Sequence, residues 1–183
     1  MSRQGIIFLD RDGVINEDID YYVTNWNEFV FRPRIFDILK MLKKRNIKVA
    51  IVTNQSCIGK GILSINELEK IHQNMIDEIN KNEGEIETIY CCPHRSEDNC
   101  ICRKPNIFMF KKAEQDLNIS LLKSIMVGNR STDITAGFNA GCRTVLVLTN
   151  ESMKYGAGIG PHFIAKDMNV LFDILDTQTK KWK

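Results

Sequence analysis

The chain has 183 residues, of which 43% are hydrophobic and 26% charged, and its formal net charge is +2. This composition is typical of a globular protein, and we expect residues 1–183 to form a single domain. The small net charge gives no reason to expect nucleic acid or a membrane surface as the main partner, and no apolar run approaches the length of a membrane span. The first apolar stretch is too short for a signal peptide, so we expect a cytoplasmic protein, and a monomer.

The stretch from Ile6 to Leu9 is entirely apolar and ends abruptly in Asp10-Arg11-Asp12-Gly13. This pattern predicts a buried parallel strand that presents two carboxylates at the carboxyl edge of a sheet, where open α/β sheets place their chemistry. Asp10 is a candidate nucleophile and Asp12 a candidate general acid and base. Because two carboxylates repel a phosphate dianion, such a site needs a hard divalent cation, for which Mg²⁺ is our choice. A capped loop with two solvated aspartates is the alternative.

The rest of the chain alternates between predicted strands and helices. Residues 16–33 lack periodicity and form a long polar and aromatic loop, which we expect to contact the substrate. Apolar spacing predicts helices over 34–45, 64–80, 107–117, 131–141 and from 167 onward. Further strands are expected at 49–52, 86–90, 125–128, 144–148 and 163–164, and a mobile loop at 156–160. About five alternations predict an α/β fold built on a doubly wound, mainly parallel, Rossmann-like sheet.

Two more of these strands end in polar side chains. The strand at 49–52 is followed by Thr53-Asn54-Gln55-Ser56, which can hold phosphate oxygens through a hydroxyl and backbone N–H groups. The strand at 125–128 is followed by Asn129, and Asp133 lies four residues later. Either side chain can complete the coordination of a metal ion, although Asp133 is also a typical helix-start residue.

Two isolated basic residues in these segments are weak evidence for a functional site. Lys60 either faces an anionic substrate or is solvated, and we expect His72 to be a surface or packing residue.

Four potential soft ligands are clustered in Cys92-Pro93-His94 and Cys100-Ile101-Cys102. Three thiolates and one imidazole in a turn-rich segment predict a closed tetrahedral zinc site within a loop at about 91–103. With no open position, the zinc is expected to be structural. Cys91 can replace Cys92 as a ligand if the register of the loop differs, and otherwise the remaining cysteines are expected to be small packing residues.

Arg103 and Lys104 follow the last predicted zinc ligand directly. The zinc would hold both cations in place, so that one neutralises the nucleophile and the transferred phosphoryl group while the other binds substrate phosphate. Ordinary surface charge is the alternative.

Together these motifs resemble the haloacid dehalogenase (HAD) superfamily of aspartate-nucleophile phosphatases. The four motifs occur in order as Asp10-Arg11-Asp12-Gly13, Thr53-Asn54, Lys104 and the segment from Gly128 to Asp133. More narrowly, the cysteine-rich insert that ends in Arg-Lys-Pro resembles that of the capless phosphatases acting on heptose bisphosphate or histidinol phosphate. The resemblance covers roughly residues 5 to 150, and this insert is its most specific part.

The resemblance implies a Mg²⁺-dependent phosphatase that acts through an aspartyl-phosphate on the 7-phosphate of D-glycero-D-manno-heptose 1,7-bisphosphate, with histidinol phosphate as the alternative substrate. It implies that Asp10 is the nucleophile and that Asp12 is the general acid and base, which also offers Mg²⁺ a backbone carbonyl. Thr53 would hydrogen-bond the phosphoryl group, and Lys104 would balance its charge. The candidates for substrate contact are Asn54, Gln55, Ser56, Arg103 and Arg130. The candidate Mg²⁺ ligands are Asp10, Asp12, Asn129 and Asp133.

Two residues depart from the family pattern. Asn129 stands where an aspartate is common, which replaces an anionic Mg²⁺ ligand with a neutral one and predicts weaker Mg²⁺ binding rather than inactivity. Cys57 stands where a glycine usually follows the Thr-Asn-Gln-Ser motif, which puts the shape of that loop in question. A zinc-stabilised binding module that has lost catalysis is the competing, non-enzymatic hypothesis.

Overall fold

A six-stranded sheet forms the centre of the computed structural model, which describes residues 3–19, 21–149 and 159–182. The loop expected at 156–160 therefore lies mostly outside the described residues. The strand order is β3-β2-β1-β4-β5-β6, and every neighbouring pair is parallel, which confirms the predicted α/β fold. The strands are β1 (Ile7–Leu9), β2 (Val49–Asn54), β3 (Thr88–Cys92), β4 (Ile125–Gly128), β5 (Arg143–Val147) and β6 (Phe163–Ala165).

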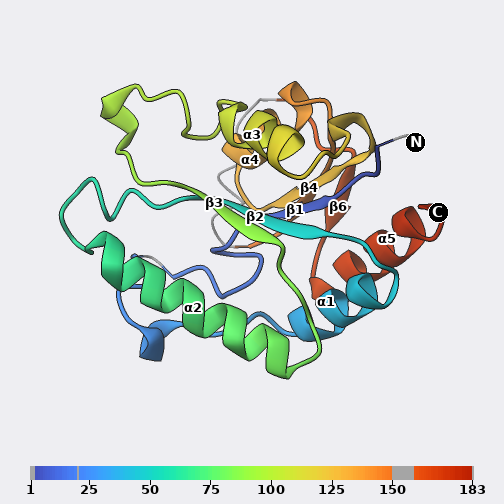
Figure 1. The fold of residues 1–183 in the computed structure, drawn as a ribbon, viewed down its shortest axis with the longest axis horizontal. Helices are drawn as coiled ribbons and strands as arrows, with labels where there is room; N and C mark the ends of the chain where they lie inside the picture. The colour runs from blue at the N-terminus through green and yellow to red at the C-terminus, as the bar shows by residue number, and fades with distance from the viewer. Residues whose placement is uncertain (1–2, 20, 150–158, 183) are drawn as a thin grey trace.

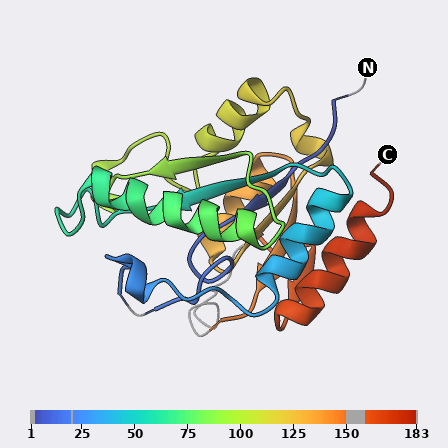
Figure 2. The ribbon, with the colours of Figure 1, turned by 60° about the horizontal axis from the view of Figure 1, so that its bottom comes forward.

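Helices cover both faces of the sheet (Figures 1 and 2). The α-helices are α1 (Ile35–Lys44), α2 (Ile65–Lys81), α3 (Phe108–Asp116), α4 (Ser131–Asn139) and α5 (Met168–Thr179). The 3-10 helices are η1 (Trp26–Glu28), η2 (Ser96–Asp98) and η3 (Leu121–Lys123). Helices α1, α2 and α5 pack against one face, and α3 and α4 pack against the other. Within the described ranges, each helix is too short or too polar to cross a lipid bilayer.

The apolar run before Asp10 is buried from both sides. Ile7 and Leu9 belong to the core beneath α1, α2 and α5, whereas Ile6 and Phe8 belong to the core on the opposite face. The Phe8 ring packs edge-on against that of Phe110 in α3, with 5.0 Å between ring centroids. Successive side chains of a strand point to opposite faces, so a strand covered on both faces is apolar at every position.

The strand order reverses between β1 and β4, which is where doubly wound sheets open a crevice at their carboxyl ends. Asp10 directly follows β1 and Asn129 directly follows β4, while Thr53 lies near the end of β2. The topology therefore brings three sequence motifs to one edge of the sheet.

Strand β3 differs from its expected position. It was predicted at 86–90 but lies at Thr88–Cys92, because pairing with β2 sets its register and aligns Asn54 with Cys92. Local composition carries little information about such pairing at the edge of a sheet. As a result, Cys92 is the last residue of a strand and is held rigidly.

Candidate active site

A pocket of about 430 Å³ opens at the carboxyl edge of the sheet. This volume is within the range of small-molecule sites. Its acidic lining residues are Asp10, Asp12, Asp18, Glu97 and Asp133. Its basic lining residues are Lys60, Arg103, Lys104 and Arg130. The remaining lining residues include Ile19, Tyr21, Tyr22, Asn54, Ser56, Ser131 and Thr132, so part of the loop at 16–33 lines this pocket, as expected for a substrate contact.

Lys104 lies at the floor of the pocket and is only 2% exposed. Its Nζ is 2.8 Å from Asp10 Oδ1 and 2.6 Å from Asp133 Oδ1, and it donates a further hydrogen bond of 2.6 Å to the Val52 carbonyl. These acceptors come from the residue after β1, from the first turn of α4 and from the backbone of β2. A buried ammonium group is costly unless hydrogen bonds and opposite charges replace its contacts with water. These three acceptors therefore fix the Lys104 ammonium beside Asp10.

Asp10 occupies an electrostatically costly position. Burial raises its pKa to about 7 against the opposing effect of Lys104, and the carboxylates of Asp133 and Asp12 add to the increase. A nucleophilic carboxylate must be ionised. A divalent cation beside Asp10 would favour the ionised form, so the residues present fit the metal-dependent chemistry expected here.

The Asp12 carboxylate is held by three side chains. Arg11 donates from Nε and Nη2 at 2.9–3.2 Å, Asn16 Nδ2 donates at 2.9 Å and Gln55 Nε2 donates at 2.8 Å. Burial alone would raise the pKa of Asp12, but Arg11 and these hydrogen bonds hold it below its usual value. Asp12 is therefore fixed and ionised in this conformation, and it must gain a proton before it can act as a general acid.

Asn129 provides a specific indication of a cation site. Its side chain is fully buried, and Oδ1 has no hydrogen-bond partner among the described residues. Its Nδ2 donates to Asp18 Oδ2 at 2.7 Å, which leaves Oδ1 as the oxygen available to a metal ion. Gly13 packs against this amide with φ +84°, and a Cβ there would lie 2.2 Å from Asn129 Nδ2. The predicted sharp turn at Gly13 thus keeps space for the amide.

Asp133 has a defined place, but both of its oxygens have partners. Oδ1 pairs with Lys104, and Oδ2 accepts the Arg130 backbone N–H at 3.0 Å at the start of α4. Asp133 is therefore a helix-start residue, as one interpretation predicted, and the same side chain also pairs with the buried Lys104.

The Thr-Asn-Gln-Ser segment mainly organises its neighbours. Gln55 Nε2 donates to Thr53 Oγ1 at 2.9 Å as well as to Asp12. Asn54 forms a reciprocal pair with the Lys104 backbone, accepting from its N–H at 3.0 Å and donating to its carbonyl at 3.1 Å. Ser56 Oγ lies 3.1 Å from the Tyr22 hydroxyl on the wall of the pocket. Of this segment, Asn54 and Ser56 line the pocket.

The cysteine-rich loop brings together the four predicted zinc ligands. The Sγ atoms of Cys92, Cys100 and Cys102 and Nδ1 of His94 all lie within 4.8 Å of one another. Ligands bound to a tetrahedral zinc ion are about 3.3–3.8 Å apart. Five of the separations among these four atoms lie between 3.2 and 3.6 Å, and four of the five fall within that range. Cys92, and not the neighbouring Cys91, belongs to the cluster.

This cluster leads directly into the pocket. Arg103 Nη1 donates to the His94 carbonyl at 3.2 Å, and the next residue is the buried Lys104. Arg103 and Arg130 both line the pocket, and Arg130 Nη2 also contacts Asp18 Oδ1 at 3.3 Å. The loop therefore contacts Arg103 through the His94 carbonyl and continues into Lys104, while the hold of a zinc ion on both cations stays a prediction.

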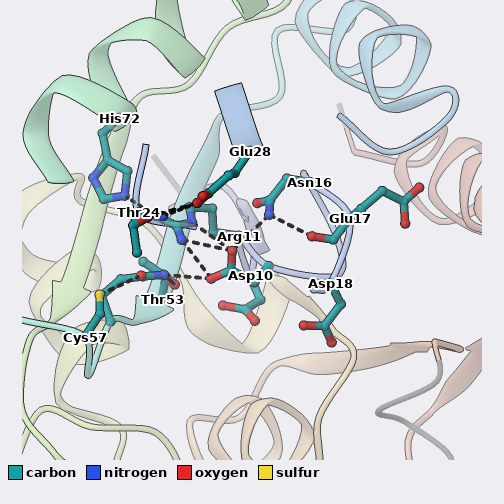
Figure 3. Close-up of polar contacts among 12 residues, drawn as sticks. Asp10, Arg11, Asn16, Glu17, Asp18, Thr24, Glu28, Thr53, Cys57 and His72 are labelled. Carbon is teal, nitrogen blue, oxygen red and sulfur yellow. Dashed lines mark hydrogen bonds and ion pairs between the residues drawn. The ribbon is translucent and has the colours of Figure 1, made fainter. Parts of the chain in front are cut away.

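Sequence reasoning missed two partners of the acidic motif. Arg11 is buried and contacts both Asp12 and His72 (Figure 3). Asp18 bridges Asn129 and Arg130. The position of Arg11 between two aspartates was a signal, because a cation directly after a buried strand needs a nearby acceptor. The role of Asp18 had no local signal, since its partner is 111 residues away.

Comparisons with known proteins point to one family. A family model described as HAD-hydrolase-like matches residues 101–171. A D-glycero-beta-D-manno-heptose-1,7-bisphosphate 7-phosphatase from Helicobacter pylori is 34% identical, covering 96% of this chain and 99% of that protein. The D-glycero-alpha-D-manno-heptose-1,7-bisphosphate 7-phosphatase of Campylobacter jejuni is 39% identical, covering 82% of this chain and 85% of its own length.

A solved structure shows the same relationship in three dimensions. The D,D-heptose 1,7-bisphosphate phosphatase from B. bronchiseptica, complexed with magnesium and phosphate, superimposes with a TM-score of 0.89 at 29% identity, covering 95% of this chain and 99% of that one. The fold, the order of the motifs and the named relatives agree. This chain therefore belongs to the haloacid dehalogenase superfamily and is a phosphatase of the branch that contains the heptose bisphosphate phosphatases.

Proposed function

We propose that this protein is a Mg²⁺-dependent phosphomonoesterase that removes the 7-phosphate of D-glycero-D-manno-heptose 1,7-bisphosphate. The observation that carries the proposal is the buried Lys104 ammonium between the carboxylates of Asp10 and Asp133. This arrangement places a fixed positive charge beside a candidate nucleophile at the floor of an open pocket. Relatives that cover nearly the whole chain carry the name of this activity.

We assign a role in this reaction to Asp10, Asp12, Lys104 and Thr53. An Asp10 oxygen attacks phosphorus in line, and the bond from phosphorus to the sugar oxygen breaks while Asp12 donates a proton to that oxygen. Asp12 then takes a proton from water, which attacks the aspartyl-phosphate, releases phosphate and restores Asp10. Lys104 balances charge throughout, and Thr53 is assigned a hydrogen bond to the phosphoryl group.

A Mg²⁺ ion would supply further charge neutralisation at this site. We assign its protein ligands to the Asp10 carboxylate, the Asp12 backbone carbonyl and Asn129 Oδ1. Asp133 was also a candidate, but its two oxygens already bind Lys104 and the start of α4, so we assign it to holding the lysine. The cysteine cluster is assigned a structural zinc ion that fixes the loop before Lys104.

The charges of the pocket suit a substrate with two phosphates. Among the described residues, Lys60, Arg103 and Arg130 line the pocket besides Lys104. With one phosphate at Asp10, a second one would lie near these cations, and guanidinium groups match phosphate oxygens well. Relatives named for the α and the β anomer both match this chain, so the proposal concerns the 7-phosphate in either anomer.

The decisive experiment compares turnover of both heptose bisphosphate anomers with that of histidinol phosphate, with and without Mg²⁺. We expect the heptose bisphosphates to be hydrolysed faster, only with Mg²⁺, and with loss of the 7-phosphate alone. Asp10→Asn should abolish turnover, whereas Asp37→Asn on the exposed surface of α1 should not. Faster hydrolysis of histidinol phosphate, or full activity of Asp10→Asn, would contradict the proposal.

We further propose that the protein works as a monomer in the cytoplasm. Size-exclusion chromatography with light scattering should give the mass of one chain, and a stable dimer would contradict this assignment.

A further inference from the structure

Arg11 connects the acidic loop to helix α2. It is among the largest fully buried side chains, with 1% of its surface exposed. Its Nε and Nη2 donate to Asp12, and its Nη1 lies 3.2 Å from Nε2 of His72, which is 61 residues away in the sequence (Figure 3). The fork of the guanidinium group is therefore used on two sides, one facing Asp12 and the other facing His72.

The chemistry of this contact fixes the state of the histidine. A guanidinium group donates hydrogen bonds and accepts none, so Nε2 of His72 must be the acceptor. The ring is consequently neutral, with its proton on Nδ1. Burial and the nearby Arg11 cation lower the pKa of His72 to about 4, which agrees with a neutral ring at neutral pH.

His72 is itself held in place by the core. It lies in the middle of α2, beside the buried stripe of Leu68, Ile71 and Met75, and is 8% exposed. The helix begins at a capping box formed by Ser64 and Glu67, which fixes its first turn. The acceptor offered to Arg11 therefore comes from a rigid element and not from a mobile loop.

We propose that His72 is a positioning residue for catalysis: by accepting a hydrogen bond from Arg11, it fixes the guanidinium group that orients Asp12 as general acid and base. This inference rests on the proposed function, in which Asp12 protonates the leaving group. Without the acceptor, Nη1 of Arg11 is buried and unsatisfied, and the guanidinium group must turn toward another acceptor. The two-point contact with Asp12 is then lost.

The test compares His72→Gln, which keeps an acceptor oxygen, with His72→Leu, which removes it. For the sugar phosphate, we expect His72→Leu to lower kcat by about tenfold or more and to leave KM nearly unchanged. This loss is part of the full contribution that a general acid makes to the rate. His72→Gln should stay within about threefold of the wild type, because one acceptor replaces another. Equal kcat values for the two variants would overturn the proposal.

A second readout separates positioning from general damage. Aryl phosphates with acidic phenol leaving groups need little protonation when the aspartyl-phosphate forms, so the kcat/KM of His72→Leu for them, which reports that first step, should stay near the wild-type value. Arg11→Lys, which loses the fork, should show the same dependence on the leaving group. Equal losses of kcat/KM on alkyl and aryl phosphates would indicate damage to the fold and would also overturn the proposal. Melting temperatures establish that each variant is folded, and His72→Met replaces His72→Leu if the latter does not fold.

A measurement without substrate distinguishes failure of this inference from failure of the proposed function. The chain has three histidines, so the ¹⁵N signals of His72 can be assigned from their absence in His72→Gln. We expect Nδ1 to be protonated and Nε2 to be unprotonated at pH 7. The opposite tautomer, or a charged ring, would overturn the role of His72 even in an active enzyme. The expected tautomer in a protein that hydrolyses no phosphomonoester would overturn the proposed function and leave His72 as a structural partner of Arg11 alone.

Discussion

The ammonium of Lys104 lies 2.8 Å from the carboxylate of Asp10, and both side chains are almost completely buried. The same ammonium is 2.6 Å from Asp133. The Lys104 ammonium therefore connects the segment after the cysteine cluster to the predicted nucleophile and to the start of α4.

Replacing Lys104 by methionine should destabilise the protein strongly. Two buried carboxylates lose their cation, and breaking a buried ion pair typically costs about 3–5 kcal/mol. Urea unfolding at pH 8 should show a loss of this order. The loss should be smaller at pH 5, because Asp10, whose pKa is already raised to about 7 by burial, is then mostly protonated. Lys111→Met is the control, because Lys111 pairs with Glu114 at the protein surface. Such surface ion pairs contribute about 0.5 kcal/mol to the free energy of unfolding. A change at Lys104 as small as that at Lys111 would contradict the role of the buried cation.

Asn129→Asp should bind Mg²⁺ more tightly than the wild type. A carboxylate replaces the neutral Oδ1 ligand, which should lower the apparent dissociation constant by about tenfold, or about 1.4 kcal/mol. Without Mg²⁺ the variant should melt at a lower temperature, because the new charge faces the carboxylate of Asp18, which lies 2.7 Å from the present Nδ2. Thermal melts at increasing Mg²⁺ concentration measure both effects. The exposed Asn80→Asp change controls for net charge, and equal Mg²⁺ binding by all three proteins would exclude Asn129 as a ligand.

Zinc content should distinguish the cysteines from one another. We expect about one equivalent of zinc per chain in the purified protein, and its loss in Cys92→Ser, Cys100→Ser and Cys102→Ser, since each removes one of four ligands. Cys91→Ser and Cys142→Ser should retain the metal, because neither residue belongs to the cluster. Metal analysis measures this directly. If Cys91→Ser loses zinc while Cys92→Ser retains it, Cys91 and not Cys92 is the ligand.

Removal of zinc should also affect the pocket. Arg103 donates to the His94 carbonyl, and Lys104 follows it in the chain, so disorder in the loop should displace both cations. We expect a lower kcat in Cys100→Ser than in Cys142→Ser, measured at saturating Mg²⁺. Full activity of a zinc-free protein would separate the cluster from catalysis.

His72 should make the fold less stable in acid. Its pKa is about 4 in the folded protein because of burial and Arg11, whereas an exposed histidine has a pKa of about 6.5. The unfolded chain therefore binds more protons between these values, and stability falls as the pH is lowered from about 6.5 to about 4, by up to about 3 kcal/mol. Urea unfolding between pH 7 and pH 4.5 should show a steeper loss in the wild type than in His72→Gln. Identical slopes would contradict a neutral, buried His72.

The sequence by itself determined much of this protein. The apolar run from Ile6 to Leu9 predicted a central strand because a strand covered on both faces has no polar position. Helical spacing predicted the amphipathic helices, and the spacing of cysteines and histidine predicted the cluster around Cys92 and Cys102. These signals are local, since each depends on residues a few positions apart, and they also carried the resemblance to the HAD superfamily.

Only the tertiary structure decided how the polar groups are paired. His72 was expected to be a surface or packing residue, yet its position on α2 places it against Arg11, because the helix is docked by its apolar stripe. Asp133 holds Lys104, and Asp18 holds Asn129, across more than a hundred residues in the second case. The physical reason is that an apolar pattern specifies which face of an element is buried, whereas the partner of a buried polar group depends on how two elements pack.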